Sequence, residues 1–169
     1  MVELNQLRSL SAHAGADPLL VQAAGGNTSL KDGGIMWIKA SGTWLKDAAA
    51  RDILVAVDHA AILEGLANSD PACEACTAYV RADLNATGLR PSIETTVHAL
   101  MPQRVVLHVH CVNTIAWAIR SDAEECLGER LSGFNWAFSS PSFTDVHPKD
   151  ADPVKDAFAA PTLVKLATF

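Results

Sequence analysis

The chain has 169 residues, of which 49% are hydrophobic, and this length suits one well-buried domain better than two. Its formal net charge of −6 argues against nucleic acid or an anionic membrane surface as a partner, so an anionic substrate would need a local binding site. The sequence shows neither an apolar run of membrane-spanning length nor a signal-peptide pattern, and we therefore expect a cytoplasmic protein.

The N-terminal segment is predicted to form a helix, a strand and a glycine-rich turn. Leucines recur every three positions over residues 4–10, which predicts an amphipathic helix that ends near Gly15. A predicted strand over residues 19–22 then leads into the glycines of residues 25–27. Two glycines allow a close approach to a ligand, and Asn27 offers both donors and an acceptor. A plain turn and an anion-binding loop are equally compatible with this segment.

The next segment alternates strands and helices. A strand over residues 36–39 ends in a polar loop, residues 41–43, whose hydroxyl and amide groups could bind a substrate. A second strand is predicted over residues 53–57, a helix follows to residue 67, and another helix is predicted over residues 72–87. The last of these contains the only C-x-x-C pair, which we interpret as packing, because a zinc site on that spacing normally needs a second pair.

A carboxylate and an imidazole share one face of the helix predicted after Pro91. Ser92 is placed to cap this helix, and Glu94 and His98 lie four residues apart, so both side chains should point the same way. Glu94 could simply stabilise the helix end, or it could act as a base beside a cation. For His98 we leave open core packing and a role as partner of Glu94.

Two further histidines are predicted on the strand VVLHVH. His108 and His110 are two residues apart, and such residues point to one face of a strand. The flanking valines and leucine predict a buried strand, in which two unpartnered histidines would be costly. We therefore predict that His108 and His110 bind a metal ion, zinc or another divalent cation. Asn113 is predicted to cap the following helix, over residues 115–119.

Four motifs in this order resemble the class II aldolase/adducin family. They are AGGNTS at 24–29, IKASGT at 38–43, PSIE at 91–94 and HVH at 108–110. The resemblance covers about residues 3–137 and implies an α/β fold of three layers, α/β/α, around a central, mostly antiparallel sheet. It also implies a homo-oligomer, often a tetramer.

The resemblance implies a zinc-dependent aldolase that cleaves a sugar phosphate through a metal-stabilised enediolate. Glu94 is then the general base, His108 and His110 hold the metal, and Asn27, Ser41, Gly42 and Ser92 bind the substrate. An epimerase or a decarboxylase of the same family would use the same ligands. From a different class, a non-catalytic, adducin-like structural or assembly module stays open.

The C-terminal segment departs from the family pattern. A domain over residues 1–138 is expected to precede a divergent, proline-rich tail over residues 139–169, in which the third zinc histidine of the family has no counterpart. His147 is the one histidine in this tail, and its surroundings match no ligand motif. The tail could be a natural short form, a truncated or frameshifted product, or a part that another chain completes.

Overall fold

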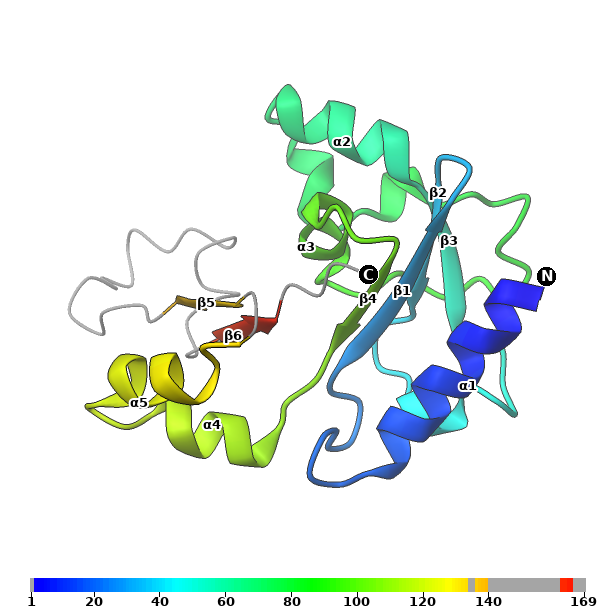
Figure 1. Cartoon of the computed structure of the whole chain (residues 1–169). Helices are drawn as coiled ribbons and strands as arrows, with labels where there is room; N and C mark the ends of the chain where they lie inside the picture. The colour runs from blue at the N-terminus through cyan, green and yellow to red at the C-terminus, as the bar shows by residue number, and fades with distance from the viewer. Residues whose placement is uncertain (1, 134–135, 140–161, 166–169) are drawn as a thin grey trace. The chain divides into compact units, whose positions relative to one another are not determined.

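The computed structural model describes residues 2–133, 136–139 and 162–165, drawn in colour in Figure 1. The chain divides into two compact units, Met1–His110 and Cys111–Phe169. The domain boundary expected at residue 138 stays a prediction, and most of the proline-rich tail, with His147, lies outside the described residues.

The first unit is built on a four-stranded antiparallel sheet with the order β3-β2-β1-β4. Its strands are β1 (Asn27–Asp32), β2 (Ile35–Lys39), β3 (Leu54–Asp58) and β4 (Val105–His108). β1 and β2 form a hairpin whose turn places Gly33 and Gly34 at positive φ, a conformation that glycine adopts at little cost. The predicted antiparallel sheet is therefore confirmed.

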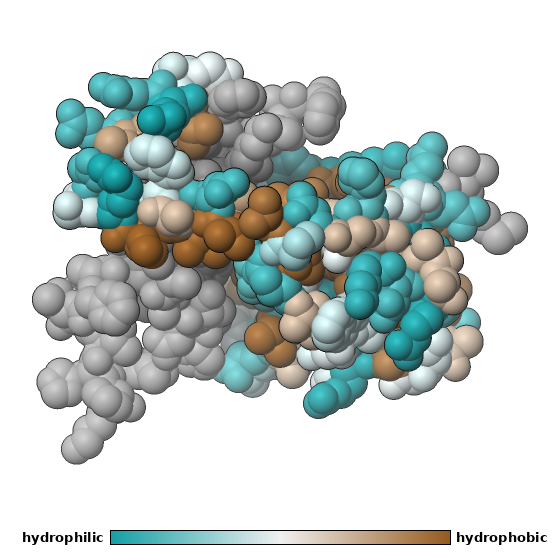
Figure 2. Space-filling view, turned by 90° about the horizontal axis from the view of Figure 1, so that it is seen from below, coloured by the Kyte–Doolittle hydropathy of each residue, from teal (hydrophilic) through white to brown (hydrophobic). Residues whose placement is uncertain are grey.

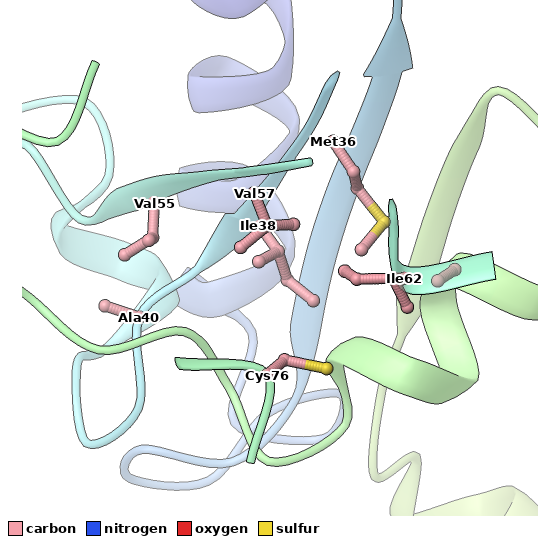
Figure 3. Close-up of a cluster of buried hydrophobic side chains, with 8 residues drawn as sticks. Met36, Ile38, Ala40, Val55, Val57, Ile62 and Cys76 are labelled. Atoms are coloured by element: carbon pink, nitrogen blue, oxygen red, sulfur yellow. The ribbon is translucent and has the colours of Figure 1, made fainter. Parts of the chain in front are cut away.

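Helices cover both faces of this sheet. α1 (Val2–Ala16) packs Leu7 against Leu30 and Leu54 on one face. α2 (His59–Ala67) and α3 (Thr95–Leu100) belong to the other face, where a larger buried cluster lies. Figure 3 draws this cluster and labels seven of its members: Met36, Ile38, Ala40, Val55, Val57, Ile62 and Cys76. Alternate residues of the central strands thus pack into two hydrophobic cores, one on each face of the sheet, as a three-layer α/β/α arrangement requires.

Two predicted elements are absent from the described structure. The helix predicted over residues 72–87 is replaced by two short 3-10 turns, η2 (Pro71–Cys73) and η3 (Thr77–Tyr79). A continuous helix is interrupted between them at Cys76, whose φ of 52° lies in the left-handed region. The strand predicted over residues 19–22 is instead a turn closed by the carbonyl of Asp17.

β4 lies at the edge of the sheet, and the prediction that it is buried was wrong for half of its side chains. Val106 is buried, but Val105 and Leu107, which share the opposite face, are 46% and 43% exposed. The cluster under α1 involves β1, β2 and β3 and includes no residue of β4. Figure 2 colours the described surface by hydropathy, and hydrophobic residues in brown are visible there among hydrophilic ones in teal.

The second unit contains two helices and a small antiparallel pair of strands. α4 (Val112–Ala118) and α5 (Ala123–Arg130) bury Ala118, Ala123 and Leu127 against one another. β5 (Trp136–Ser139) pairs with β6 (Thr162–Lys165). The N-cap position of α4 is Cys111, so the predicted capping role of Asn113 was wrong. Within the coloured parts of Figure 1, no helix has the length and apolar character needed to cross a membrane.

Candidate active site

Glu94 is positioned by a tight turn immediately before α3. The Ser92 hydroxyl accepts a hydrogen bond from the Glu94 amide at 3.2 Å, and the Thr95 hydroxyl donates to the Ser92 carbonyl at 2.5 Å. Pro91 forms an isolated bridge with Ala40, which ties this turn to the end of β2. Glu94 thus occupies the N-cap position of α3, so the helix begins two residues later than predicted, and the prediction that Ser92 caps it was wrong.

Two donors from neighbouring strands converge on one oxygen of Glu94. Asn27 and His108 lie directly opposite each other where β1 and β4 pair. The Asn27 Nδ2 donates to Glu94 Oε2, and His108 Nδ1 lies 3.0 Å from the same oxygen. The predicted base Glu94 therefore contacts both the predicted substrate ligand Asn27, 67 residues away in the sequence, and the predicted metal ligand His108, 14 residues away.

The ionisation of Glu94 determines which nitrogen of His108 is protonated. Burial raises the pKa of Glu94, but the hydrogen bond from His108 and the nearby histidine charges outweigh burial, and the pKa lies below its ordinary value. Glu94 is therefore ionised at neutral pH, and a carboxylate only accepts hydrogen bonds. His108 must then carry a proton on Nδ1, which leaves Nε2 available as a ligand atom.

His110 lies two residues beyond His108, just after the end of β4. The two imidazole rings have their centroids 4.9 Å apart, with an angle of 57° between the ring planes. Burial, and next the charge of His108, lower the pKa of His110, so its ring is neutral at pH 7, the form that binds metals. A Cβ on Gly25 would come within 3.0 Å of His110 Nδ1, and only glycine leaves room for the ring there.

The donor chemistry of this cluster fits zinc. Two neighbouring imidazoles, one of them oriented through Nδ1 by a carboxylate, form the arrangement in which zinc-binding histidines are commonly held. Among the described residues, however, no set of three or more His, Cys, Asp or Glu side chains is arranged to hold a metal ion. The described residues therefore offer two histidine ligands for a metal ion, and its other coordination sites would need oxygen or nitrogen donors from elsewhere.

His98 is fully buried beside this cluster; its amide donates to the Glu94 carbonyl at 3.1 Å, but its side chain forms no hydrogen bond with the Glu94 carboxylate. Its Nδ1 lies 2.8 Å from the Ser29 hydroxyl, and its Nε2 is buried without a hydrogen-bond partner among the described residues. Burial lowers the pKa of His98 to about 4, so the ring is neutral at pH 7. Asn27 Oδ1 is the other buried side-chain atom in the described residues that lacks a partner.

The remaining predicted substrate ligands lie at the margin of the cluster. Ser41 and Gly42 are exposed in the loop after β2, and the Ser41 amide donates to the Arg90 carbonyl at 3.0 Å, beside the Glu94 turn. Gly42 lines a shallow recess of about 420 Å³ together with Thr43, Trp44, Lys46, Asp47 and Arg51. Ser92 is 5% exposed, and its hydroxyl is engaged with the Glu94 amide.

Sequence reasoning missed Lys39, a residue of β2 that is only 2% exposed. The strand itself was predicted, but no role was assigned to its lysine. The available signal was the odd position of a charged residue at the end of an otherwise apolar strand and directly before Ala40-Ser41-Gly42.

Comparison with known proteins agrees with this architecture. A family model described as "Class II Aldolase and Adducin N-terminal domain" matches residues 9–138. A solved structure described as the N-terminal class II aldolase domain of a conserved protein from Thermoplasma acidophilum aligns with a TM-score of 0.61 and 23% identity. The alignment covers 74% of this chain and 62% of that one, so this chain spans less than two thirds of that protein's length, and the likeness shows the fold. No curated protein matches the chain.

Proposed function

Because this chain belongs to the class II aldolase and adducin family, as its four motifs indicated, we propose that it is a metal-dependent lyase that cleaves a carbon–carbon bond in a sugar phosphate. The observation that carries the proposal is the cluster in which Glu94 is hydrogen-bonded to Asn27 and His108, with His110 alongside. A carboxylate beside two imidazoles supplies a base next to a cation site.

The proposed metal ligands are His108 and His110, and zinc is the metal that their chemistry fits best. Bound there, zinc would polarise the substrate carbonyl and acidify the adjacent hydroxyl. The protein's part is to hold the rings: Glu94 orients His108 through Nδ1, and the bare backbone of Gly25 leaves space for His110.

Glu94 is the proposed general base. Its carboxylate removes the proton from the hydroxyl of the carbon that becomes the aldehyde, and the bond between that carbon and the carbon next to the carbonyl breaks. The bonding electron pair stays with the carbonyl fragment, the aldehyde leaves, and Glu94 returns the proton to the carbanionic carbon. The low pKa of Glu94 makes it a weak base, so the transfer depends on placement and on an acidified hydroxyl.

The substrate phosphate is proposed to lie at the loop of Ser41 and Gly42. Lys46, Asp47 and Arg51 line the recess beside this loop. Asp47 forms an ion pair with Arg51 at 3.7 Å, so a net single positive charge remains there on a chain whose net charge is −6. Asn27 was predicted to bind the phosphate as well. Its amide already donates to Glu94, and its proposed role is therefore to orient the base.

The alternative is an adducin-like assembly module without catalysis, favoured by the lack of a third histidine ligand among the described residues. Epimerase and decarboxylase reactions would use the same metal and base. We expect a cytoplasmic homo-oligomer in each case, as for other members of the family.

The deciding experiment combines metal analysis with a substrate screen. The purified chain is expected to hold zinc stoichiometrically and to release an aldehyde from at least one ketose phosphate. His110→Ala should lose the metal, whereas Glu94→Gln, which keeps a hydrogen-bond acceptor for His108, should keep the metal and lose about 10²–10⁴-fold in rate. Glu64→Gln, on the exposed side of α2, is the control. Substoichiometric zinc that is unchanged in His110→Ala would rule out the lyase and leave the assembly module.

A further inference from the structure

Lys39 is a buried charged side chain for which the proposed chemistry gives no role. It is 2% exposed, at the last position of β2, on a strand whose other residues are apolar. Burying an ammonium group is costly unless strong hydrogen bonds compensate for the lost water. Burial accordingly lowers the pKa of Lys39, while the charge of Glu94 opposes this shift.

The Lys39 side chain joins two loops. Its Nζ donates to the Ala24 carbonyl at 2.9 Å and to the Thr43 carbonyl at 2.7 Å. Ala24 belongs to the loop that enters β1, and Thr43 belongs to the loop that leaves β2. A second hydrogen bond, from the Thr43 hydroxyl to the Ala40 carbonyl at 2.8 Å, closes the latter loop on itself.

Both loops border the candidate active site. The first contains Gly25, whose Cα faces the His110 ring, and it runs directly into Asn27, which donates to Glu94. The second contains Ser41, whose amide is bonded to the Arg90 carbonyl next to the Glu94 turn. A movement of either loop would therefore displace a group that holds the base, the metal ligand or the substrate.

We propose that Lys39 is a positioning residue that clamps the 24–27 loop and the 41–43 loop together, so that both hold the anionic group of the substrate. This inference rests on the proposed phosphate site. Two backbone carbonyls are held at fixed positions by one ammonium group, whose positive charge also favours an anion bound above the loops. Lys39 contacts the loops and not the reacting atoms.

Lys31 provides a matched control within the same sheet. Its Nζ also donates to two backbone carbonyls, those of Met101 at 2.7 Å and Gln103 at 2.8 Å, but these lie in the connection between α3 and β4. Lys39→Met and Lys31→Met therefore remove the same number and kind of hydrogen bonds. They differ in whether the substrate loops are released.

The test uses the full chain, with inorganic phosphate as the probe. Lys39→Met should weaken phosphate binding by about tenfold or more and speed amide hydrogen exchange in residues 24–27 and 41–43, whereas Lys31→Met should change neither. Lys39→Arg, which keeps the donors, should restore part of the affinity. Equal phosphate affinity and loop exchange in Lys39→Met and Lys31→Met would overturn the proposal.

If Lys39→Met does not fold, the proposal can be tested by amide hydrogen exchange of the wild-type protein with and without phosphate. Added phosphate should then slow amide exchange in both loops of the wild type, and protection of one loop or neither overturns the clamp. Zinc titration separates this inference from the proposed function. Normal zinc binding without phosphate protection defeats the clamp alone, while phosphate protection of both loops without zinc binding supports the clamp and defeats the metal-dependent reaction.

Discussion

At the scale of single residues, the site depends on how one carboxylate is shared. Asn27 and His108 both contact Oε2 of Glu94, and no described residue forms a hydrogen bond with Oε1. The protein therefore holds Oε2, and under the proposed function Oε1 would accept the proton of the substrate hydroxyl. An ionised, singly anchored carboxylate is well placed for proton transfer, because its own position is fixed before the substrate arrives.

A second carboxylate at position 27 should make this arrangement sensitive to pH. Asn27→Asp places two carboxylates side by side, and their repulsion raises the folded-state pKa of one of them. Stability is then retained at low pH and lost as pH rises through the raised pKa, by about 1–3 kcal/mol at pH 7. Urea denaturation at pH 5 and pH 7 would measure the effect, with Asn5→Asp on the exposed side of α1 as control. If the free energy of unfolding of Asn27→Asp differs from that of the wild type by the same amount at pH 5 and pH 7, the prediction is contradicted.

His98 should weaken the fold on acidification. Its folded-state pKa is about 4, below the ordinary 6.5, so the unfolded chain binds more protons between these values. The stability that neutral His98 contributes is fully present above pH 6.5 and is lost as pH falls, and the loss reaches about 3 kcal/mol at pH 4. His98→Gln should show a smaller loss of stability over this range than the wild type. Parallel pH profiles for the two proteins would show that His98 does not titrate in this way.

At the scale of elements, the site is assembled from residues at the ends of three strands. Asn27 begins β1, Lys39 ends β2 and His108 ends β4, so the antiparallel order brings these residues to one end of the sheet. The loops that leave this end carry Gly25 and Ser41. Rigid strands thus position the side chains, and short loops bring backbone groups close to them.

Gly25 tests whether this loop must approach His110 closely. In Gly25→Ala the added Cβ would lie 2.9 Å from the Gln22 carbonyl oxygen and 3.0 Å from His110 Nδ1. We expect the His110 ring to move and zinc affinity to fall by about 10–100-fold. Gly133→Ala is the control, since nothing lies within 4 Å of the added atom. Unchanged zinc affinity in Gly25→Ala, measured by competition with a chelator, would show that the loop adapts.

Elements with a clear local signal could be predicted from the sequence. The strands predicted over residues 36–39 and 53–57 are mostly apolar, and both are present in the structure within one residue of their predicted bounds. Their antiparallel pairing was implied by the family resemblance and not by the local pattern. The helix expected over residues 72–87 was wrong, because side-chain contacts such as Tyr79 to Asp70 at 2.8 Å hold this segment in turns. Such contacts have no periodicity for a sequence pattern to detect.

The metal and base residues of the candidate site could be predicted from the sequence, but the role of Lys39 could not. Glu94, His108 and His110 belong to residue types and spacings with a known chemistry, and they do lie together. The loop-joining role of Lys39 depends on carbonyl positions in two separate loops, which only the folded backbone defines. The burial of β4 was overestimated because an edge position cannot be recognised from an apolar run.

At the scale of the whole molecule, every residue of the candidate site lies within the first unit, Met1–His110. Although the net charge is −6, cationic side chains lie near the site: Lys39 at the end of β2, and Lys46 and Arg51 at the recess, where Asp47 pairs with Arg51. His110 is the last residue of the first unit, so a metal ion bound there would also secure the end of that unit.

Zinc should therefore stabilise the folded chain. Binding to the native state alone adds about 2.7 kcal/mol at a free zinc concentration 100 times the Kd, and the melting temperature should rise accordingly. Thermal denaturation with zinc and with a chelator would measure this, and His110→Ala should abolish the difference. An equal shift in His110→Ala would place the metal elsewhere.

The pairing of Asn27 with His108 has a consequence for the order in which the chain acquires its structure. β1, β2 and β3 follow one another along the chain and can pair across short connections, whereas β4 must close a long loop before it reaches β1. The three-stranded meander can therefore exist before the carboxylate and the imidazoles meet. A nascent chain could therefore form three of the four strands of the sheet before Glu94 and His108 come together, which happens only when β4 pairs with β1.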